Sequence, residues 1–294
     1  MSVEVLRTVA ALGQRCEEVR SRGGWIGFVP TMGALHEGHL ALARAARARV
    51  GADGLVVTSI FVNPTQFAAH EDLSKYPRDL DADVARCATA GVNVVFAPSV
   101  DEIYPRGDST RVRVSGVSEP LEGEFRPTHF EGVATVVARL FNAVGPCVAV
   151  FGRKDYQQLR VVTRMTRDLL LPVEVVGHRT IREGDGLAMS SRNRYLSPAD
   201  RARAAKIPAA LGLTVRAWEG GERATERLRE TAENALRPWV DAVDYVALRD
   251  ADDLSALPDV LADERRAVLA VAVRVGGTRL IDNVVLGVDP PPCG

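Results

Sequence analysis

The fold of this chain is constrained most by a regular alternation of short apolar runs with longer helical segments, from its start to about residue 180. The pattern predicts helices at residues 3–20, 40–50, 79–90, 130–144 and 156–170, and strands at residues 25–29, 55–61, 92–96, 147–151 and 173–176. The strands are continuous apolar runs, which is typical of strands whose two faces are both covered by helices. The sequence therefore predicts a parallel, doubly wound sheet.

A second domain is predicted after Arg182, where a glycine-containing loop interrupts the alternation. Ser197 and Pro198 supply a capping hydroxyl and a first-turn proline for a long helix. We expect helices at 198–218 and 222–236, and strands at 243–248, 267–275 and 279–286, with a hairpin turn at Gly276-Gly277. The expected fold is therefore α/β, with a Rossmann-like domain at residues 1–182 and a smaller α+β lid domain at residues 183–294.

The composition is that of an ordinary globular protein, because 46% of the 294 residues are hydrophobic and 26% are charged. With 37 basic and 38 acidic residues the net charge is close to zero, so no global field recruits nucleic acid. The most apolar helical candidate, residues 133–144, is interrupted by Arg139 and Asn142. We therefore expect small-molecule partners, with neither nucleic acid nor a membrane involved.

The cysteines point to a reducing environment. Four are present, far apart and without a CxxC pair: Cys16, Cys87, Cys147 and Cys293. This spacing favours free thiols in a cytoplasmic protein over a disulfide framework.

The segment 30–39, PTMGALHEGH, follows one predicted strand and leads into a helix. Gly33 permits close backbone approach, and the unpaired N–H groups at the start of a helix attract anions. His36 and His39 are three residues apart, so we expect both imidazoles on one face of the first helical turn. The segment predicts a phosphate-binding site.

Two other interpretations of the histidine pair are an ordinary turn with surface histidines and half of a zinc site. The remaining histidines, His70, His129 and His178, are scattered singly, so no second half of a zinc site is visible.

Two polar clusters lie at or near the ends of predicted elements. In the segment 61–67, FVNPTQF, Pro64 stops the strand and leaves the Asn63 and Gln66 amides at the sheet edge. In the segment 126–132, RPTHFEG, an arginine and a histidine precede a helix, and capping of that helix by Thr128 is the simplest explanation.

Two further clusters carry positive charge. In the segment 151–159, FGRKDYQQL, Lys154 can contact a phosphate, while Asp155 can cap the helix or bind a ribose hydroxyl. The loop 185–196, DGLAMSSRNRYL, is rich in hydroxyl and guanidinium groups and can close over a triphosphate, unless it is only an interdomain linker. Together the clusters suit attack on the α-phosphate of a nucleotide.

The set of motifs resembles the class I nucleotidyltransferase superfamily and, more closely, the pantothenate synthetase family of pantoate–β-alanine ligases. The resemblance rests on five segments: PTMGALHEGH (30–39), FVNPTQF (61–67), RPTHFEGV (126–133), GRKDYQQL (152–159) and DGLAMSSRNRYL (185–196). It spans most of the N-terminal domain and the junction, whereas the last hundred residues match in layout more than in motif.

The resemblance implies which residues bind ATP. They are Met32, Gly33, Ala34, Leu35, His36, Glu37, Gly38, His39, Gly152, Arg153, Lys154, Asp155, Ile181, Met189, Ser190, Ser191 and Arg192. Gln66 and Gln158 would bind pantoate together with Asn63, and Gln66 would also face β-alanine. His39, His36, Lys154 and Arg192 are the expected catalytic residues. The family also implies a homodimer and Mg²⁺.

Two positions depart from the family pattern. Arg153 stands where the family usually has glutamate, which reverses a charge beside Lys154. In the acidic stretch 79–83, Ala82 stands where some relatives have a carboxylate, and Asp83 is the candidate metal ligand that remains.

The expected reaction is a two-step ligation in which the pantoate carboxylate attacks the α-phosphorus of ATP, and the amine of β-alanine then displaces AMP. Lys154, Arg192, His39 and Mg²⁺ would spread the developing negative charge. One alternative is another nucleotidyltransferase that adenylylates a small acid or a mononucleotide and keeps the nucleotide on its product. A second alternative is a nucleotide-sensing module without turnover.

Overall fold

The structure, a computed structural model, describes residues 3–66 and 78–292. Phe67, His70 and Cys293, which the sequence analysis named, lie outside these residues. The chain forms two compact units. Unit 1 comprises Met1–Arg153 and Gln158–Arg179, and unit 2 comprises Lys154–Gln157 and Thr180–Gly294.

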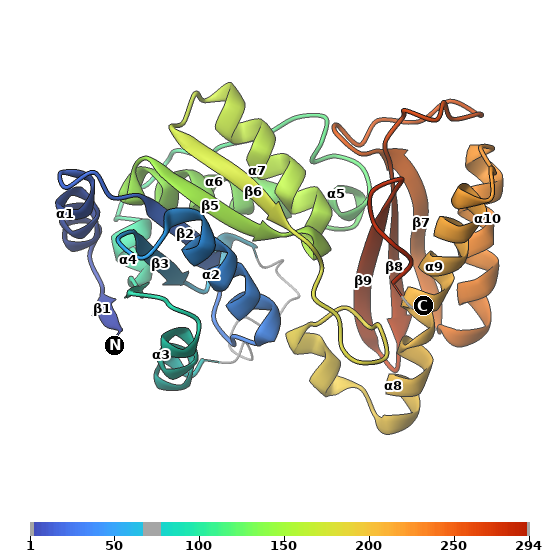
Figure 1. Ribbon diagram of the computed structural model, residues 1–294, viewed down its shortest axis with the longest axis horizontal. Helices are drawn as coiled ribbons and strands as arrows, with labels where there is room; N and C mark the ends of the chain where they lie inside the picture. Colours follow the sequence, from blue (N-terminus) through green and yellow to red (C-terminus); the bar gives the residue numbers. More distant parts are fainter. Residues whose placement is uncertain (1–2, 67–77, 293–294) are drawn as a thin grey trace. The chain divides into compact units, whose positions relative to one another are not determined.

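Unit 1 is built on a six-stranded sheet with the strand order β1-β4-β3-β2-β5-β6 (Figure 1). Its strands are β1 (Glu4–Leu6), β2 (Ile26–Thr31), β3 (Leu55–Ile60), β4 (Val94–Phe96), β5 (Cys147–Gly152) and β6 (Val173–His178). Every pair of neighbouring strands is parallel, which confirms the α/β fold that the continuous apolar runs predicted.

Helices cover both faces of this sheet. The longer ones are α1 (Val9–Arg20), α2 (Glu37–Val50), α3 (Leu80–Thr89), α6 (His129–Val144) and α7 (Tyr156–Asp168), and α4 (Val100–Ile103) and α5 (Glu122–Phe125) are single turns. On one face, residues of α2 and α3 pack against Val29 of β2 and Val150 of β5. The adjacent Phe28 points the opposite way and contacts Phe141 of α6 with ring centroids 6.3 Å apart. Apolar side chains therefore pack against both faces of the sheet.

The strand order reverses between β2 and β5. From β2 the sheet continues through β3 and β4 on one side, and from β5 it continues to β6 on the other. In open parallel sheets, ligands bind outside the carboxyl ends of the strands at such a switch point. The segments that leave it are Met32–His36, after β2, and Arg153, after β5.

The start of the chain differs from the expectation of one helix over residues 3–20. Glu4–Leu6 instead form the edge strand β1, which pairs with Val94–Phe96 of β4. α1 begins only after Thr8, whose hydroxyl accepts a hydrogen bond from the Ala11 amide. The strand predicted at residues 25–29 also differs, since β2 runs from Ile26 through Pro30 to Thr31.

Unit 2 combines a three-stranded antiparallel sheet, β7 (Ala242–Asp250), β8 (Ala267–Val275) and β9 (Thr278–Leu286), with α8 (Pro198–Ala204), α9 (Lys206–Glu219) and α10 (Thr225–Leu236). Gly276 and Gly277, both with positive φ, form the predicted hairpin turn. Ser197 caps α8 as expected, with Pro198 in its first turn. The predicted single helix over 198–218 is broken at Ala205, because Pro208 lacks an N–H and is accommodated only in the first turn of a new helix.

Among the described residues, no helix combines the length and the apolarity that crossing a membrane requires. Cys16, Cys87 and Cys147 are buried, unpaired thiols, as expected from their spacing.

Candidate active site

The loop after β2 brings the two predicted histidines together. His36 is the N-cap residue of α2, and its Nδ1 accepts a 3.1 Å hydrogen bond from the Gly38 amide. His39 Nδ1 accepts a 3.3 Å hydrogen bond from the His36 amide, and the two ring centroids are 4.1 Å apart. The pair therefore forms a reciprocal cap, and His36 lies just before the first helical turn.

These hydrogen bonds fix the tautomer of both neutral rings. A backbone N–H can only donate, so Nδ1 of each imidazole must carry a lone pair and the ring proton sits on Nε2. The start of α2 carries the positive end of the helix dipole with two Nε2–H donors beside it, although Glu37 adds a negative charge in the first turn.

Asp83, the candidate metal ligand, is buried beneath the same loop with 2% of its surface exposed. Its Oδ2 accepts from the Ala34 amide and its Oδ1 from the Leu35 amide, both at 2.8 Å. Among residues 3–66 and 78–292, no three His, Cys, Asp or Glu side chains are grouped as a metal site would require.

Asn63 and Gln66, the predicted substrate amides, are joined directly. Asn63 Nδ2 donates to Gln66 Oε1 at 3.0 Å and to the Gly132 carbonyl at 3.2 Å. Asn63 Oδ1 accepts from the hydroxyl of Tyr104 at 2.8 Å and from that of Thr65 at 3.0 Å. Oε1 of Gln66 accepts this hydrogen bond, and the NH₂ group is the hydrogen-bond donor of the same side chain.

Two side chains of the segment 126–133 contact the backbone of Gln66. His129 Nδ1 and Arg126 Nη2 both lie 3.2 Å from the Gln66 carbonyl oxygen, which can only accept. Thr128 occupies the N-cap position of α6, but its side chain makes no capping hydrogen bond, so the simplest sequence explanation of this motif was wrong. The motif instead fixes the backbone of Gln66.

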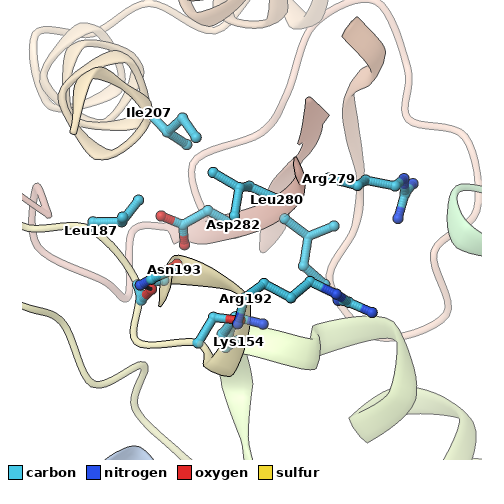
Figure 2. Close-up of a pocket in the computed structure, with 11 residues that line it drawn as sticks. Lys154, Leu187, Arg192, Asn193, Ile207, Arg279, Leu280 and Asp282 are labelled. Atoms are coloured by element: carbon cyan, nitrogen blue, oxygen red, sulfur yellow. Dashed lines mark hydrogen bonds between the residues drawn. The ribbon is translucent and has the colours of Figure 1, made fainter. Parts of the chain in front are cut away.

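Unit 2 contains a small pocket that gathers three predicted ATP residues, Lys154, Ser190 and Arg192 (Figure 2). Figure 2 shows Lys154 and Arg192 close together at one side of the pocket, while Arg279 extends away from them. The Lys154 side chain is 17% exposed and its Nζ lies 3.6 Å from Asp155 Oδ1. Ser190 caps the short helix η4 (Ser191–Tyr195) by accepting from the Arg192 amide at 3.2 Å. The charged residues that line the pocket are thus Lys154, Arg192, Arg279 and Asp282.

The loop that carries Ser190 and Arg192 is tied to β9 by a buried ion pair. Arg182 Nη1 and Nη2 contact Asp282 Oδ2 at 2.7 Å and Oδ1 at 3.1 Å. The Asp282 side chain is only 1% exposed. Arg182 also donates to the Gly186 carbonyl, and the Met189 amide donates to the Ile181 carbonyl at 2.9 Å.

A second set of charges holds the outer part of this loop. Arg201 of α8 donates to Glu183 at 2.6 Å and also pairs with Asp185. The hydrogen bond from Arg201 is the main reason that the pKa of Asp185 lies below its ordinary value. The loop is therefore held in a defined conformation by ion pairs within unit 2.

Several residues that shape the candidate site lie outside the motifs identified from the sequence. Tyr104, Arg182 and Asp282 are the main ones, and each acts through another residue. A signal existed for Asp282, because a single carboxylate inside the apolar strand 278–286 is rarely buried without a partner. Gln158, the second predicted pantoate residue, lies half-buried on α7, and Gly152 ends β5.

A parallel sheet with a glycine-bearing loop and a capped helix start at its switch point defines an α/β protein of the nucleotide-binding class. The family model for pantoate–β-alanine ligase matches residues 4–285. The chain belongs to the pantoate–β-alanine ligase family, as the sequence resemblance indicated.

Relatives support this assignment over the whole chain. A pantothenate synthetase of Moorella thermoacetica is 51% identical over 98% of this chain and 100% of the relative, and one of a Nocardioides species is 54% identical over 91% and 80%. The crystal structure of pantothenate synthetase from Thermus thermophilus superposes with a TM-score of 0.87 at 46% identity, covering 99% of this chain and 100% of that one. A pantoate–β-alanine ligase from Francisella tularensis, complexed with β,γ-ATP and β-alanine, has a TM-score of 0.76 at 31% identity, covering 96% and 97%.

Proposed function

We propose that the protein condenses pantoate with β-alanine to give pantothenate, with ATP as the activating substrate. The observation that carries this proposal is the family match over residues 4–285, which includes the His36–His39 cap and the Lys154–Arg192 pocket. Two chemical steps are needed, because a carboxylate is a poor acyl donor until its oxygen is part of a good leaving group.

In the first step an oxygen of the pantoate carboxylate bonds to the α-phosphorus of ATP, and the bond from that phosphorus to the bridging oxygen breaks to release diphosphate. In the second step the amine of β-alanine bonds to the acyl carbon and loses a proton, and the carbon–oxygen bond to AMP breaks. Positioning and neutralisation of the phosphate charge are the main tasks of the protein.

Charge neutralisation is assigned to residues of both units. His36 and His39 would donate from Nε2 to phosphate oxygens, a role supported by the Nδ1 hydrogen bonds that fix their tautomer. Lys154 and Arg192 would carry the positive charge, supported by their proximity in the unit 2 pocket. We propose that the whole predicted set, Met32–His39, Gly152–Asp155, Ile181 and Met189–Arg192, serves one ATP molecule.

Pantoate would be bound by amides. The NH₂ group of Gln66 suits a hydroxyl or carboxylate oxygen, and its orientation by Asn63 supports this role. Gln158 is the second proposed contact to pantoate, and Gln66 would also face β-alanine.

Magnesium is proposed to accompany ATP. The part of the chain described by the structure offers no group of three acidic, histidine or cysteine side chains, and both oxygens of Asp83 already accept amide hydrogen bonds. The described side chains therefore do not fit a protein-built magnesium site, and Mg²⁺ would be held by the phosphates and water.

The proposal is tested by incubating the purified protein with pantoate, β-alanine and ATP, omitting each in turn. We expect equal amounts of pantothenate, AMP and diphosphate, and exchange of labelled diphosphate into ATP that needs pantoate but not β-alanine. A product that keeps the nucleotide would favour another nucleotidyltransferase. ATP binding without turnover would favour a nucleotide-sensing module.

A homodimer and a cytoplasmic location are proposed together with this function. The dimer rests on the family resemblance alone, and sedimentation of the purified protein tests it. The location is supported by the three buried free thiols, which a reducing compartment would preserve.

A further inference from the structure

We propose that Asp83 and Arg86 of α3 are positioning residues that hold the segment Gly33–Leu35 in the conformation that receives ATP. This inference rests on the proposed function of the loop after β2. α3 would contribute to nucleotide binding indirectly, because neither residue would contact the ligand.

Asp83 meets the loop through both carboxylate oxygens. The amides of Ala34 and Leu35 each donate to a different oxygen at 2.8 Å, and the side chain is 2% exposed. A buried carboxylate is stable only when its charge is met by donors, and the nearest cation, Arg86 Nη1, is 3.9 Å from Oδ1. The two loop amides are therefore essential partners of this charge.

Arg86 holds the same loop from its carbonyl side. Its Nη1 donates to the carbonyl oxygen of Leu35, while Asp83 accepts from the Leu35 amide. Asp83 and Arg86 are three residues apart on α3 and so lie on one face of the helix. Both polar groups of Leu35 are thus bound to a single turn of α3.

The loop needs such support because its backbone is unfavourable. Gly33 has φ +85° and Ala34 has φ +51°, so two successive residues adopt the left-handed conformation. Alanine adopts it only at a cost, because its Cβ approaches the carbonyl oxygen. A Cβ on Gly33 would lie 3.0 Å from Asp83 Oδ2 and 3.1 Å from Ile60 Cγ2.

This conformation decides where the histidines lie. Leu35 is buried at 2% exposure, and His36 follows it as the N-cap of α2. If Ala34 relaxed to an ordinary conformation, the start of α2 and both imidazoles would be displaced from the end of β2. The charged pair of α3 therefore keeps the Nε2–H donors in place.

A metal-ligating role for Asp83 makes an opposite prediction. Loss of a magnesium ligand would raise the half-saturating Mg²⁺ concentration, and more Mg²⁺ would partly restore activity. Loss of a residue that holds a backbone loop would leave the half-saturating Mg²⁺ concentration unchanged. The two roles are therefore separable by one titration.

The main variant is Asp83→Asn, which keeps the shape but turns one acceptor oxygen into an NH₂ group facing a backbone N–H. We expect the Kd of ATP, measured by calorimetry, and the KM of ATP to rise about 10- to 100-fold. The KM of β-alanine and the half-saturating Mg²⁺ concentration should change less than about twofold, and hydrogen exchange of residues 32–36 should accelerate. Asp81→Asn, an equal charge change at an exposed position of α3, is the matched control.

An unchanged Kd of ATP in Asp83→Asn, or recovery of its affinity at high Mg²⁺, would overturn the proposal. If Asp83→Asn does not fold, Arg86→Met provides the test, since it leaves the carboxylate and its two amide partners intact. A rise of about 3- to 10-fold in the Kd of ATP is expected for that variant, and an unchanged Kd would contradict the positioning role of Arg86. The Kd of ATP is measured directly, so this test does not depend on whether the wild-type protein forms pantothenate.

Discussion

The hydroxyl of Tyr104 donates a 2.8 Å hydrogen bond to Oδ1 of Asn63, and through this contact a residue remote in sequence orients an amide that we propose binds substrate. Burial raises the pKa of the Tyr104 phenol, so it remains a donor at neutral pH. With Oδ1 engaged, Asn63 turns its NH₂ group toward Oε1 of Gln66, and we propose that the NH₂ group of Gln66 then contacts pantoate.

Tyr104→Phe is therefore expected to weaken pantoate binding. Loss of one hydrogen bond costs about 1 kcal/mol, so the KM of pantoate should rise about fivefold while the KM of ATP stays constant. Steady-state kinetics with each substrate varied measures the split. Tyr245→Phe, which removes a hydroxyl from β7, serves as the control, and equal changes in both KM values would contradict the assignment.

Lys154→Met and Arg192→Ala should each slow adenylate formation. Removing one preorganised donor to a developing charge costs about 100- to 1000-fold in turnover. Pantoate-dependent exchange of diphosphate into ATP isolates this step. Arg194→Ala removes an exposed cation of the same short helix, which contacts the Tyr195 ring at 5.2 Å, and should have little effect. Exchange rates that match the wild type in Lys154→Met would exclude its catalytic role.

The Arg182–Asp282 pair makes a prediction about stability. Removing one partner leaves a buried charge unpaired, so Arg182→Met should lower the free energy of unfolding by about 3 to 5 kcal/mol. The double variant Arg182→Met with Asp282→Leu removes both charges and should recover a large part of that loss. Urea unfolding followed by circular dichroism measures both variants, and a double variant as unstable as the single one would be inconsistent with this explanation.

Gly132→Ala should displace the segment that carries Gln66. A Cβ at this position would lie 2.4 Å from the Thr65 carbonyl oxygen and 2.8 Å from its carbonyl carbon. Because both are backbone atoms, no side-chain rotation can relieve this clash. We expect a lower melting temperature and a higher KM for pantoate. Gly184→Ala adds the same methyl group where nothing lies within 4 Å, and it should leave the melting temperature unchanged.

The buried thiols predict a loss of stability at alkaline pH. Burial raises the pKa of Cys16 and of Cys87 to about 11, and that of Cys147 to about 12, above the ordinary thiol value of 9.0. Because the folded state favours the neutral thiol, this contribution is fully present below pH 9 and is lost as the pH rises toward 11. Stability curves between pH 8 and 11 test this, and iodoacetamide at pH 8 should leave the three thiols unmodified in the native protein. Rapid alkylation of any of them would contradict their burial.

Much of the fold was predictable because buried strands consist of continuous apolar residues. The central strands of unit 1 are covered on both faces, and their unbroken apolar runs reveal it. The edge strand Glu4–Leu6 has no such run, since two of its three residues are exposed, and only its pairing with β4 makes it a strand. The break at Ala205 depends on one proline within a sequence that otherwise favours a helix.

The candidate site could be proposed from the sequence where side chains carry recognisable functional groups, as in His36, His39 and Lys154. It was not predictable where a side chain binds backbone atoms. Asp83 reaches the Ala34 amide across 49 positions of sequence, and His129 reaches the Gln66 carbonyl across 63. Every residue except proline offers both a backbone N–H and a carbonyl, so such contacts cannot be recognised from the type of the partner residue.

Lys154–Gln157 belong to unit 2, although the residues on either side of them belong to unit 1. Within unit 2, the Lys154 carbonyl accepts from Asn283 Nδ2 at 2.7 Å, and the Tyr156 hydroxyl donates to the Ala251 carbonyl at 2.8 Å. A fragment expressed from Thr180 onward would therefore leave Asn283 and Ala251 without these partners, and it would also lack the ammonium group of the pocket. No single cut of the gene yields both units complete, so neither unit can be produced as one uninterrupted fragment that excludes residues of the other.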